Sequence, residues 1–185
     1  AYVFRTTDGG ATWVQTAKLT ASDATSNDLF GCAVAIYGDT IVVGAYAWTI
    51  RGGDGWGSAY VFRTTDSGAT YLEVAILTAS DAAVGDNFGN SVAIAGDTVV
   101  VGARFDDVAQ PDDGIDSGSV YVFRTTDGGA TYGQVAKLTG ADTATGDSFG
   151  RSVGIYGDTV VVGTYSKEAA YVFRTTDGGA TYGQV

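Results

Sequence analysis

The chain has 185 residues, 45% of them hydrophobic, with 28 glycines and a formal net charge of -11. This length suits one domain, and the apolar content is too high for a disordered tail. The negative charge would repel a phosphate backbone, so we expect no nucleic-acid partner.

Residue types that are missing from the chain exclude several kinds of chemistry. The sequence has no histidine and a single cysteine, Cys32. His-based catalytic triads, His-ligated zinc and an intrachain disulfide are therefore excluded. No window is as long and apolar as a membrane span, and no stretch resembles a signal peptide. Because the sequence starts within a repeat, we expect it to be a piece of a longer product.

A repeated segment organises the whole chain. The letters YVFRTTD begin at Tyr2, Tyr60, Tyr121 and Tyr171, with spacings of 58, 61 and 50 residues. Self-similarity at this period indicates a solenoid or a propeller. Most of the variation in length falls between the letters VVG and YVF of each copy, where we expect a surface loop.

Each copy divides into four strand-like segments, shown by FGNSVAIA, DTVVVGAR, SVYVFRTT and ATYGQVAKLTG in residues 88–140. Four strands per repeat are typical of a propeller blade. The predicted fold is all-β, a β-propeller segment of about three and a half four-stranded antiparallel blades that forms an open fragment of a larger propeller. In chain order the expected parts of this one continuous domain are a half blade at 1–24, blades at 25–82 and 83–143, and a blade with a truncated last strand at 144–185.

The alternation of side chains assigns the strands to places within a blade. The first strand has branched residues such as Val92 and Ile94 on one face and small residues such as Ala93 on the other, which suits the crowded propeller axis. The second strand, TVVVG, is apolar on both faces, as expected between two neighbouring blades. A Gly-Asp pair separates these two strands and predicts a tight primed hairpin turn.

The order of these motifs resembles FG-GAP repeats, the propeller units also found in integrin alpha subunits. FGxxV(A/G)I, a short turn, (V/I)VVG(A/T), a loop and YVF follow one another across essentially the whole chain. Integrin-type repeats carry a calcium loop, D-x-[DN]-x-D-G, between the first two strands, but here that junction is YGDT or AGDT. One Asp in a two-residue turn cannot supply the six or more oxygens of a calcium site. The resemblance is therefore to repeats without the calcium loop, for which we expect no cofactor.

The segment that follows YVF resembles the Asp-box of sialidases and related BNR-repeat proteins. Its pattern, T-x-D-x-G-x-T-[WY], is matched by residues 6–13, 64–71, 125–132 and 175–182. In that family the motif is a hairpin between strands 3 and 4, where the strand assignment also places it. We expect Asp8 to cap amides of the turn, Gly10 to take a positive φ and Trp13 to pack back on the blade. Four identical roles at the periphery indicate architecture, so no catalytic residue is predicted.

The loops on one face are the predicted place of a binding site. Since the turns between strands 1 and 2 and between strands 3 and 4 share one face, the 2–3 loops and the 4–1 connections share the other. Two interpretations stay open for the first 2–3 loop. In the first interpretation, its aromatic and charged residues bind a sugar ring or a protein partner. In the second, its aromatic rings cover neighbouring blades. The candidate ligand-binding residues are Trp48, Arg51, Asp54 and Trp56.

The second 2–3 loop is strongly acidic. Its aspartates are numerous enough for a calcium site if the loop folds back on itself, but no known ligand spacing fits, and a solvated acidic loop is the favoured interpretation. These weak calcium candidates are Asp106, Asp107, Asp112, Asp113 and Asp116. We expect the aspartates of the 4–1 connections to form turns, with a cation shared between blades as the alternative. They are Asp23, Asp81 and Asp142, followed by Asp28, Asp86 and Asp147.

These observations favour a non-catalytic binding or adhesion module of a larger extracellular or cell-surface protein, with a protein or glycan ligand on the 2–3 loop face. Two alternatives stay open. A sialidase-type glycosidase would need an arginine triad, and Arg51, Arg104 and Arg151 lie on or near that face, but no Tyr-Glu nucleophile pair is recognisable. A purely structural spacer would need no ligand.

The two ends of the chain do not complete one blade. The N-terminal pair lacks strands 1 and 2, whereas the C-terminal blade already has its own. We therefore expect an open arc whose exposed sheet faces need further sequence or another copy to cover them. A clean, stable monomer of the 185-residue chain in light scattering would contradict this expectation.

Overall fold

The computed structural model describes residues 1–46, 55–107 and 116–185, and in these ranges it contains strands and no helix. A half blade consists of β1 (Tyr2–Arg5) and β2 (Val14–Lys18). The first blade consists of β3 (Ala33–Tyr37), β4 (Thr40–Ala45), β5 (Ser58–Arg63) and β6 (Leu72–Leu77). The second blade consists of β7 (Phe88–Ala95), β8 (Thr98–Ala103), β9 (Ser119–Arg124) and β10 (Gly133–Leu138). The third blade consists of β11 (Ser152–Tyr156), β12 (Thr159–Gly163), β13 (Ala170–Arg174) and β14 (Gly183–Gln184).

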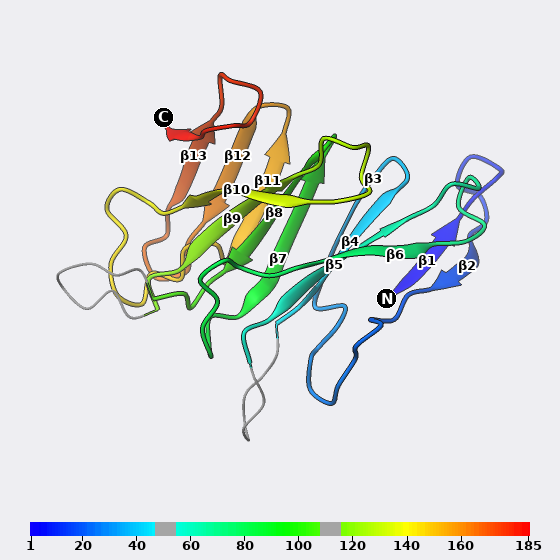
Figure 1. The fold of residues 1–185 in the computed structure, drawn as a ribbon, viewed down its shortest axis with the longest axis horizontal. Coiled ribbons are helices and arrows are strands. Elements are labelled where there is room, and N and C mark those ends of the chain that lie inside the picture. Colours follow the sequence, from blue (N-terminus) through cyan, green and yellow to red (C-terminus); the bar gives the residue numbers. More distant parts are fainter. Residues whose placement is uncertain (47–54, 108–115) are drawn as a thin grey trace.

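Every sheet is an antiparallel meander in which strands adjacent in sequence pair with one another. The sheets follow one another along an open arc, with β1 and β2 at one end and β11 to β14 at the other (Figure 1). The predicted all-β fold, an open β-propeller fragment, is confirmed. Within the described ranges no helix is long and apolar enough to cross a membrane.

The hydrophobic core lies between the blades rather than within one of them. One cluster joins Val3 and Leu19 of the half blade to Val43 and Tyr60 of the first blade. A second cluster joins the first blade to the second, and a third joins the second blade to the third. Each blade is therefore stabilised by its neighbours, as in other repeat architectures.

Strand 2 of each blade shows how a neighbour on each side changes burial. All six residues of β4 and of β8 are buried, because both faces of these strands are covered. In β12, Val160 and Val162 are fully buried, whereas Val161 between them is 42% exposed. The third blade thus has a covered face toward the second blade and an uncovered face on its other side. The predicted sandwiching of strand 2 is confirmed where two neighbours exist.

The Phe-Gly pair at the start of each copy fits a buried corner between blades. Phe88 is fully buried and meets Tyr121 and Phe123 edge-on, with ring centroids 5.5 and 6.0 Å apart. Gly89 has a φ of 88°, and a Cβ at this position would overlap the carbonyl oxygen of Ser58. Only a residue without a side chain permits this backbone approach, which explains the Gly of the motif.

Two details differ from the expectations from sequence. Phe30 lies outside any strand, and β3 begins at Ala33, whereas β7 begins at Phe88. Trp13 is 62% exposed and therefore does not pack back on a blade as expected. Its counterpart Tyr132 packs against the cluster between the first and second blades. Trp13 lacks this cover because no blade precedes the half blade in the described chain.

Candidate functional site

The arc has two ends that differ in their loops. At the turn end, each 3–4 hairpin is bound to the 1–2 turn of the same blade, with 3.0 Å between Thr64 N and the oxygen of Asp39. At the loop end, the 2–3 loops of the first and second blades are bound to the connection that enters the next blade, as in the 3.2 Å bond from Phe88 N to the oxygen of Trp56. The predicted division of turns and loops between two faces is confirmed.

A closed network of hydrogen bonds holds each hairpin of the turn end. The Thr64 hydroxyl donates to Asp66 at 2.7 Å and accepts from Gly68 N at 2.8 Å. Asp66 also accepts from the amide and the hydroxyl of Thr70, at 2.9 and 2.6 Å. Hydrogen bonds from Thr70 and Thr64 hold the pKa of Asp66 well below its usual range. Asp8, Asp127 and Asp177 accept the same bonds in the other copies. All four carboxylates therefore hold the turn of their own hairpin by hydrogen bonds, as expected.

The arginine at the end of strand 3 joins each hairpin network to the preceding blade. The Arg63 guanidinium donates to the oxygen of Gly128 in the hairpin of the second blade. A Cβ at Gly129 would lie 3.0 Å from Arg63 Cδ, so the guanidinium stem fills the space that a side chain would need. Arg5 and Arg124 lie in the same way against Gly68 and Gly179. Sequence reasoning placed these arginines beside the hairpin but missed that they bridge two blades.

Trp56 is the candidate ligand-binding residue whose position the structure describes. The adjacent Gly55 and Gly57 are buried, and the oxygen of Gly55 accepts from Gly85 N at 3.1 Å. These contacts fix the backbone on both sides of Trp56 to the connection that enters the second blade. The indole itself is 45% exposed. Trp48, Arg51 and Asp54 lie outside the described residues.

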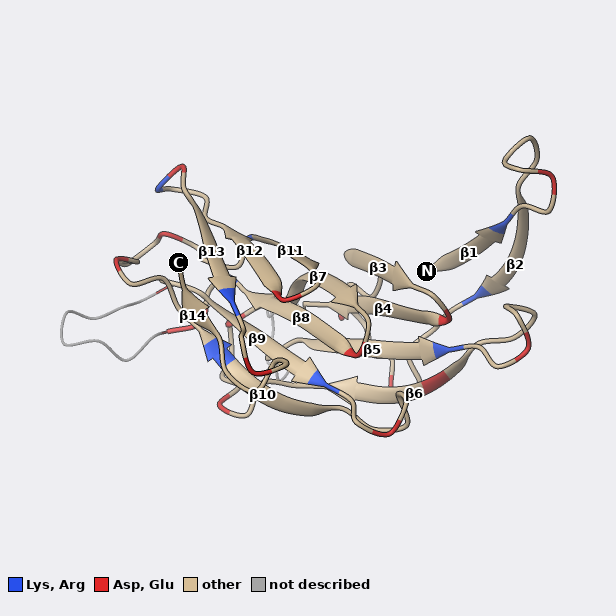
Figure 2. Cartoon of the chain, turned by 90° about the horizontal axis from the view of Figure 1, so that it is seen from above, with Lys and Arg blue, Asp and Glu red and all other residues tan. Residues whose placement is uncertain are grey.

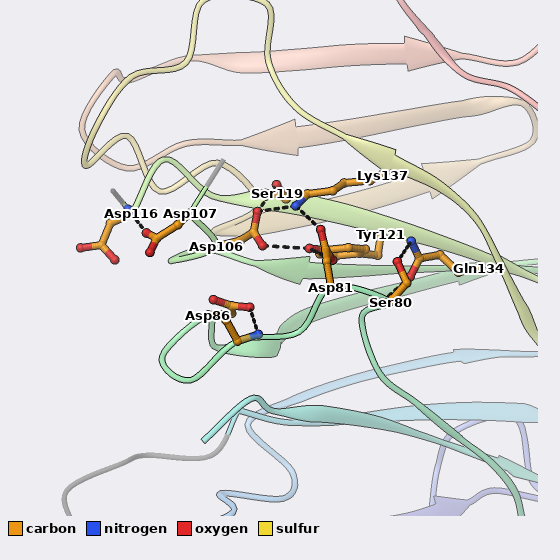
Figure 3. A network of polar contacts seen from close by, with 11 residues as sticks. Ser80, Asp81, Asp86, Asp106, Asp107, Asp116, Ser119, Tyr121, Gln134 and Lys137 are labelled. Atoms are coloured by element: carbon orange, nitrogen blue, oxygen red, sulfur yellow. Dashed lines mark hydrogen bonds and ion pairs between the residues drawn. The ribbon is translucent and has the colours of Figure 1, made fainter. Parts of the chain in front are cut away.

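Asp106 of the acidic loop lies in a buried ion-pair network between two blades (Figure 3). Its carboxylate is 2.8 Å from Lys137 Nζ and accepts from the Ser119 and Tyr121 hydroxyls at 2.6 and 2.9 Å. Lys137 also contacts Asp81 at 2.6 Å, so one ammonium group bridges two carboxylates. Burial lowers the pKa of Lys137, but hydrogen bonds to Asp106 and Asp81 outweigh it and raise that pKa. The lysine thus supplies the positive charge that these two carboxylates need.

Asp107 and Asp116 of the acidic loop are exposed, unlike Asp106. Asp107 accepts from the amide of Asp116 at 2.9 Å, and Asp116 has a φ of 55°. Burial and the neighbouring Asp107 charge raise the pKa of Asp116. Asp112 and Asp113 lie outside the described residues. In the parts of the chain that the structure describes, no three acidic or cysteine side chains are grouped so that they could hold a metal ion.

Aspartates of the 4–1 connections have two distinct roles. Asp28, Asp86 and Asp147 each accept from the amide three residues earlier, at 2.5, 2.6 and 2.7 Å. They form turns, as expected. Asp23, Asp81 and Asp142 instead accept from a tyrosine hydroxyl of the next blade, at 2.8, 2.8 and 2.7 Å. No local sequence pattern indicates these inter-blade bonds, because each tyrosine lies about 30 to 40 residues further on.

The buried carboxyl of Asp86 predicts a pH dependence of stability. Burial, together with the Asp106 and Asp107 charges, raises the pKa of Asp86 to about 6, although the Ala83 amide opposes this rise. Between about pH 4 and 6 the folded state holds a proton that the unfolded state has lost. The contribution of Asp86 to the free energy of unfolding is therefore full below about pH 4 and is lost as the pH rises through about 6.

Asp86→Asn should remove this loss while keeping an oxygen that accepts from Ala83. Urea unfolding of both proteins between pH 4 and 7 measures the effect. We expect the variant to gain stability relative to the wild type as the pH rises. Parallel profiles for the two proteins would contradict the assignment.

Cys32 and two arginines lie at the start of strand 1 or the end of strand 2. The Cys32 thiol donates to the oxygen of Gly89 at 3.3 Å, and burial raises its pKa, which favours an unreactive thiol. The Arg104 guanidinium lies 5.5 Å from the Tyr46 ring centroid, and that of Arg151 lies 5.9 Å from Tyr165. Burial and the Arg151 charge lower the pKa of Arg104. Arg51, the third residue of the hypothetical triad, lies outside the described residues.

Comparison with known proteins agrees with this architecture. A model of the FG-GAP repeat matches residues 13–62, 71–123 and 132–182. No match is found among curated proteins. Among solved structures, the chain is similar to the crystal structure of Saccharomyces cerevisiae Sqt1, with a TM-score of 0.53 and 11% sequence identity. The similarity covers 86% of this chain and 35% of that one, so this chain spans about a third of its length. The three matches place one repeat after another along the chain, in the order that the blades follow, and the chain belongs to the FG-GAP repeat family.

Proposed function

We propose that the chain is a non-catalytic recognition module that binds a glycan or protein ligand at the loop end of its arc. The observation that supports this most is Trp56, an exposed indole on a backbone that is bonded to the next blade. A rigidly held aromatic face binds with little loss of conformational entropy, and it suits either a sugar ring or an apolar protein surface. An extracellular or cell-surface setting in a larger protein is part of the same proposal.

The turn end offers less for recognition. Its aspartates and threonines bond to one another, and three of its arginines lie against the next hairpin. These groups already have partners within the fold, so binding a ligand there would break contacts between blades. The loops vary in length and sequence from copy to copy, whereas the hairpins have one length and a nearly identical sequence. Divergent loops on a rigid scaffold are the usual place for binding.

A glycan array tests the proposal. The wild type is compared with a Trp48→Ala/Trp56→Ala variant, and Trp13→Ala is the matched control because Trp13 is an exposed tryptophan at the turn end. We expect defined oligosaccharides to be bound by the wild type and the control, and binding to fall at least tenfold in the double variant, as for a lost aromatic anchor. Loss of binding in Trp13→Ala alone would contradict the assignment. No binding by any of the three proteins would favour the spacer.

The hydrolase alternative predicts a different result. Two of the three arginines that it needs are described, and each guanidinium already lies near an aromatic ring. A fluorogenic sialoside separates the alternatives. We expect no hydrolysis, and turnover that is lost in an Arg51→Ala/Arg104→Ala/Arg151→Ala variant would overturn the proposed function.

A further inference from the structure

The second 2–3 loop starts with a tight turn at the loop end of the middle blade. β8 ends at Ala103, and the Asp106 amide donates to the Ala103 oxygen at 3.1 Å. Arg104 and Phe105 are the two residues at the corner of this turn. The Arg104 amide donates to the Asn90 side chain at 3.0 Å, and the Phe105 amide donates at 3.1 Å to the connection that enters this blade. The backbone beneath both side chains is therefore fixed.

Aromatic rings flank the guanidinium groups of this region. The Arg104 guanidinium lies 4.5 Å from the ring centroid of Phe105 and 5.5 Å from that of Tyr46, which follows β4 of the first blade. In the third blade, the Arg151 guanidinium lies 5.9 Å from the ring centroid of Tyr165. A guanidinium on the face of a ring keeps the N–H groups at its edge available for an acceptor. The rings thus orient the two charges without neutralising them.

Asn90 holds the backbones of the two arginines next to each other. Its side-chain oxygen accepts from the Arg104 amide, and its side-chain nitrogen donates to the oxygens of Gly150 and Arg151 at 3.1 and 3.3 Å. Burial and the nearby Arg151 charge lower the pKa of Arg104, as expected for two like charges that lie close together. The arginines and their aromatic neighbours form one row across three blades, which we call the arginine surface: Tyr46, Arg104, Phe105, Arg151 and Tyr165.

The guanidinium groups of the arginine surface have no countercharge among the described residues. The ion pairs of that part of the chain involve Lys137 and Lys167, and neither Arg104 nor Arg151 donates a side-chain hydrogen bond there. This is unexpected in a chain with 21 acidic and 10 basic residues. Arg63 at the turn end differs, because it donates to the hairpin of the next blade. Two adjacent guanidinium groups without an acceptor are stabilised by an anionic group that bridges them.

We propose that the arginine surface binds a carboxylate of a protein partner, within a segment whose other side chains are apolar. This inference rests on the proposed recognition function, and it assigns the class of partner and the charge that the partner carries. A guanidinium binds a planar carboxylate through two parallel N–H donors. Tyr46 and Phe105 are half-buried and Tyr165 is exposed, so rings on both sides of the charges remain available for apolar contact.

Composition and position favour a protein over other anionic ligands. Tyr, Trp and Arg contribute most to binding in protein interfaces. Trp56 is joined to the arginine surface, because its oxygen accepts from the amide of Phe88, which lies opposite Ala103 at the end of β8. The row crosses three blades, which suits a protein segment better than a single sugar ring. The net charge of -11 repels a polyanion such as a nucleic acid or a sulfated glycan, so the carboxylate belongs to a partner of low overall charge.

Peptide selection on the immobilised full chain tests the proposal. The probe is a library of short random peptides, and each selected peptide is also synthesised with its Asp or Glu replaced by Asn or Gln. We expect the selected peptides to share an acidic residue between apolar ones. Removal of this charge should raise the dissociation constant about tenfold or more in fluorescence anisotropy. Selected peptides without an acidic residue, or a library that yields no binder, would show that the assignment is wrong.

Substitutions in the chain locate the contact. Arg151→Gln changes an exposed side chain, so this variant should fold normally and bind the acidic peptide about tenfold more weakly. Arg104→Lys keeps the charge but loses the planar fork, so it should weaken binding by a smaller factor. Arg174→Gln is the matched control, because it removes the same charge from the turn end, where Arg174 donates to Thr159 at 3.2 Å. Equal losses in Arg151→Gln and Arg174→Gln would contradict a contact at the arginine surface.

The tryptophan variant separates this inference from the proposed function. Peptide binding that survives Arg104→Gln/Arg151→Gln but is lost in Trp48→Ala/Trp56→Ala would overturn the carboxylate contact and leave recognition at the loop end intact. Binding that needs both arginines but neither tryptophan would support the carboxylate contact and overturn the role of Trp56. If acidic glycans rather than peptides were bound through the arginines, the protein partner would be the wrong class.

Discussion

Phe88→Ala should lower the free energy of unfolding by about 3–5 kcal/mol, because it empties a fully buried site between the first and second blades. The ring meets Tyr121 and Phe123 edge-on, and both lose this contact. Since the cluster contains side chains of two blades, the loss weakens the interface that holds them together. Urea denaturation followed by tryptophan fluorescence measures the change.

Phe30→Ala is the matched control, because Phe30 makes the same edge-on contacts with Tyr60 and Phe62. Phe30 is partly exposed, so its removal should cost clearly less than that of Phe88. If both substitutions lowered the free energy of unfolding equally, burial by a complete neighbouring blade would not determine how much the Phe of this motif stabilises the fold.

Lys137→Met should cost about 3 kcal/mol of stability, because it leaves Asp106 buried without a countercharge. The Asp106 side chain is 4% exposed, and the Ser119 and Tyr121 hydroxyls would be its remaining partners. Methionine keeps most of the apolar stem of the lysine, so the loss reports on charge more than on packing. The same urea titration measures it at pH 7.

Two further variants test whether the loss of stability in Lys137→Met comes from the buried charge of Asp106. Lys167→Met removes a lysine of the third blade whose partner Asp142 has a 66% exposed side chain, and we expect little or no change in stability. Adding Asp106→Asn to Lys137→Met should restore part of the stability, because the buried group is then neutral. If Lys137→Met and Lys167→Met cost the same, the network in Figure 3 does not depend on burial.

The strands and their order follow from local patterns in the sequence. Alternation of branched and small residues around Val92 identified the innermost strand, and the doubly apolar TVVVG segment identified the strand that lies between blades. The Gly-Asp pair predicted the turn between them, and Gly38 has the positive φ of 55° that a primed turn with Gly first requires. These features repeat in each copy, so the fold could be predicted with little ambiguity.

Contacts between blades could not be predicted in the same way. Lys137 aligns with Lys18 and Ile76 in the other copies, so its repeat position does not indicate an ion pair. Its partners Asp81 and Asp106 come from two different connections, which only the packing of the blades brings together. Likewise, Arg63 was placed beside its own hairpin, but its long side chain reaches the next one.

The candidate binding site was predicted in part. The division into a turn end and a loop end followed from strand order, and the exposed Trp56 lies at the loop end. The backbone bonds that hold this residue join segments about 30 residues apart, which no local pattern reveals. Figure 2 shows the acidic residues mostly on turns and loops. The acidic composition of the second loop predicted carboxylates near one another. It did not predict that Lys137 neutralises Asp106 of this loop together with Asp81 of the preceding connection.

Hydrogen exchange of the dilute monomer tests most directly whether the chain is an open arc with one fully enclosed blade. The amides of β8 and β9 should exchange slowest, close to the limit of global unfolding, because both faces of these strands are buried. β1, β2 and β14, which have few buried residues, should exchange fastest. Equal protection of β1 and β8 in the monomer would contradict the open arc and indicate that the half blade is covered within a single chain.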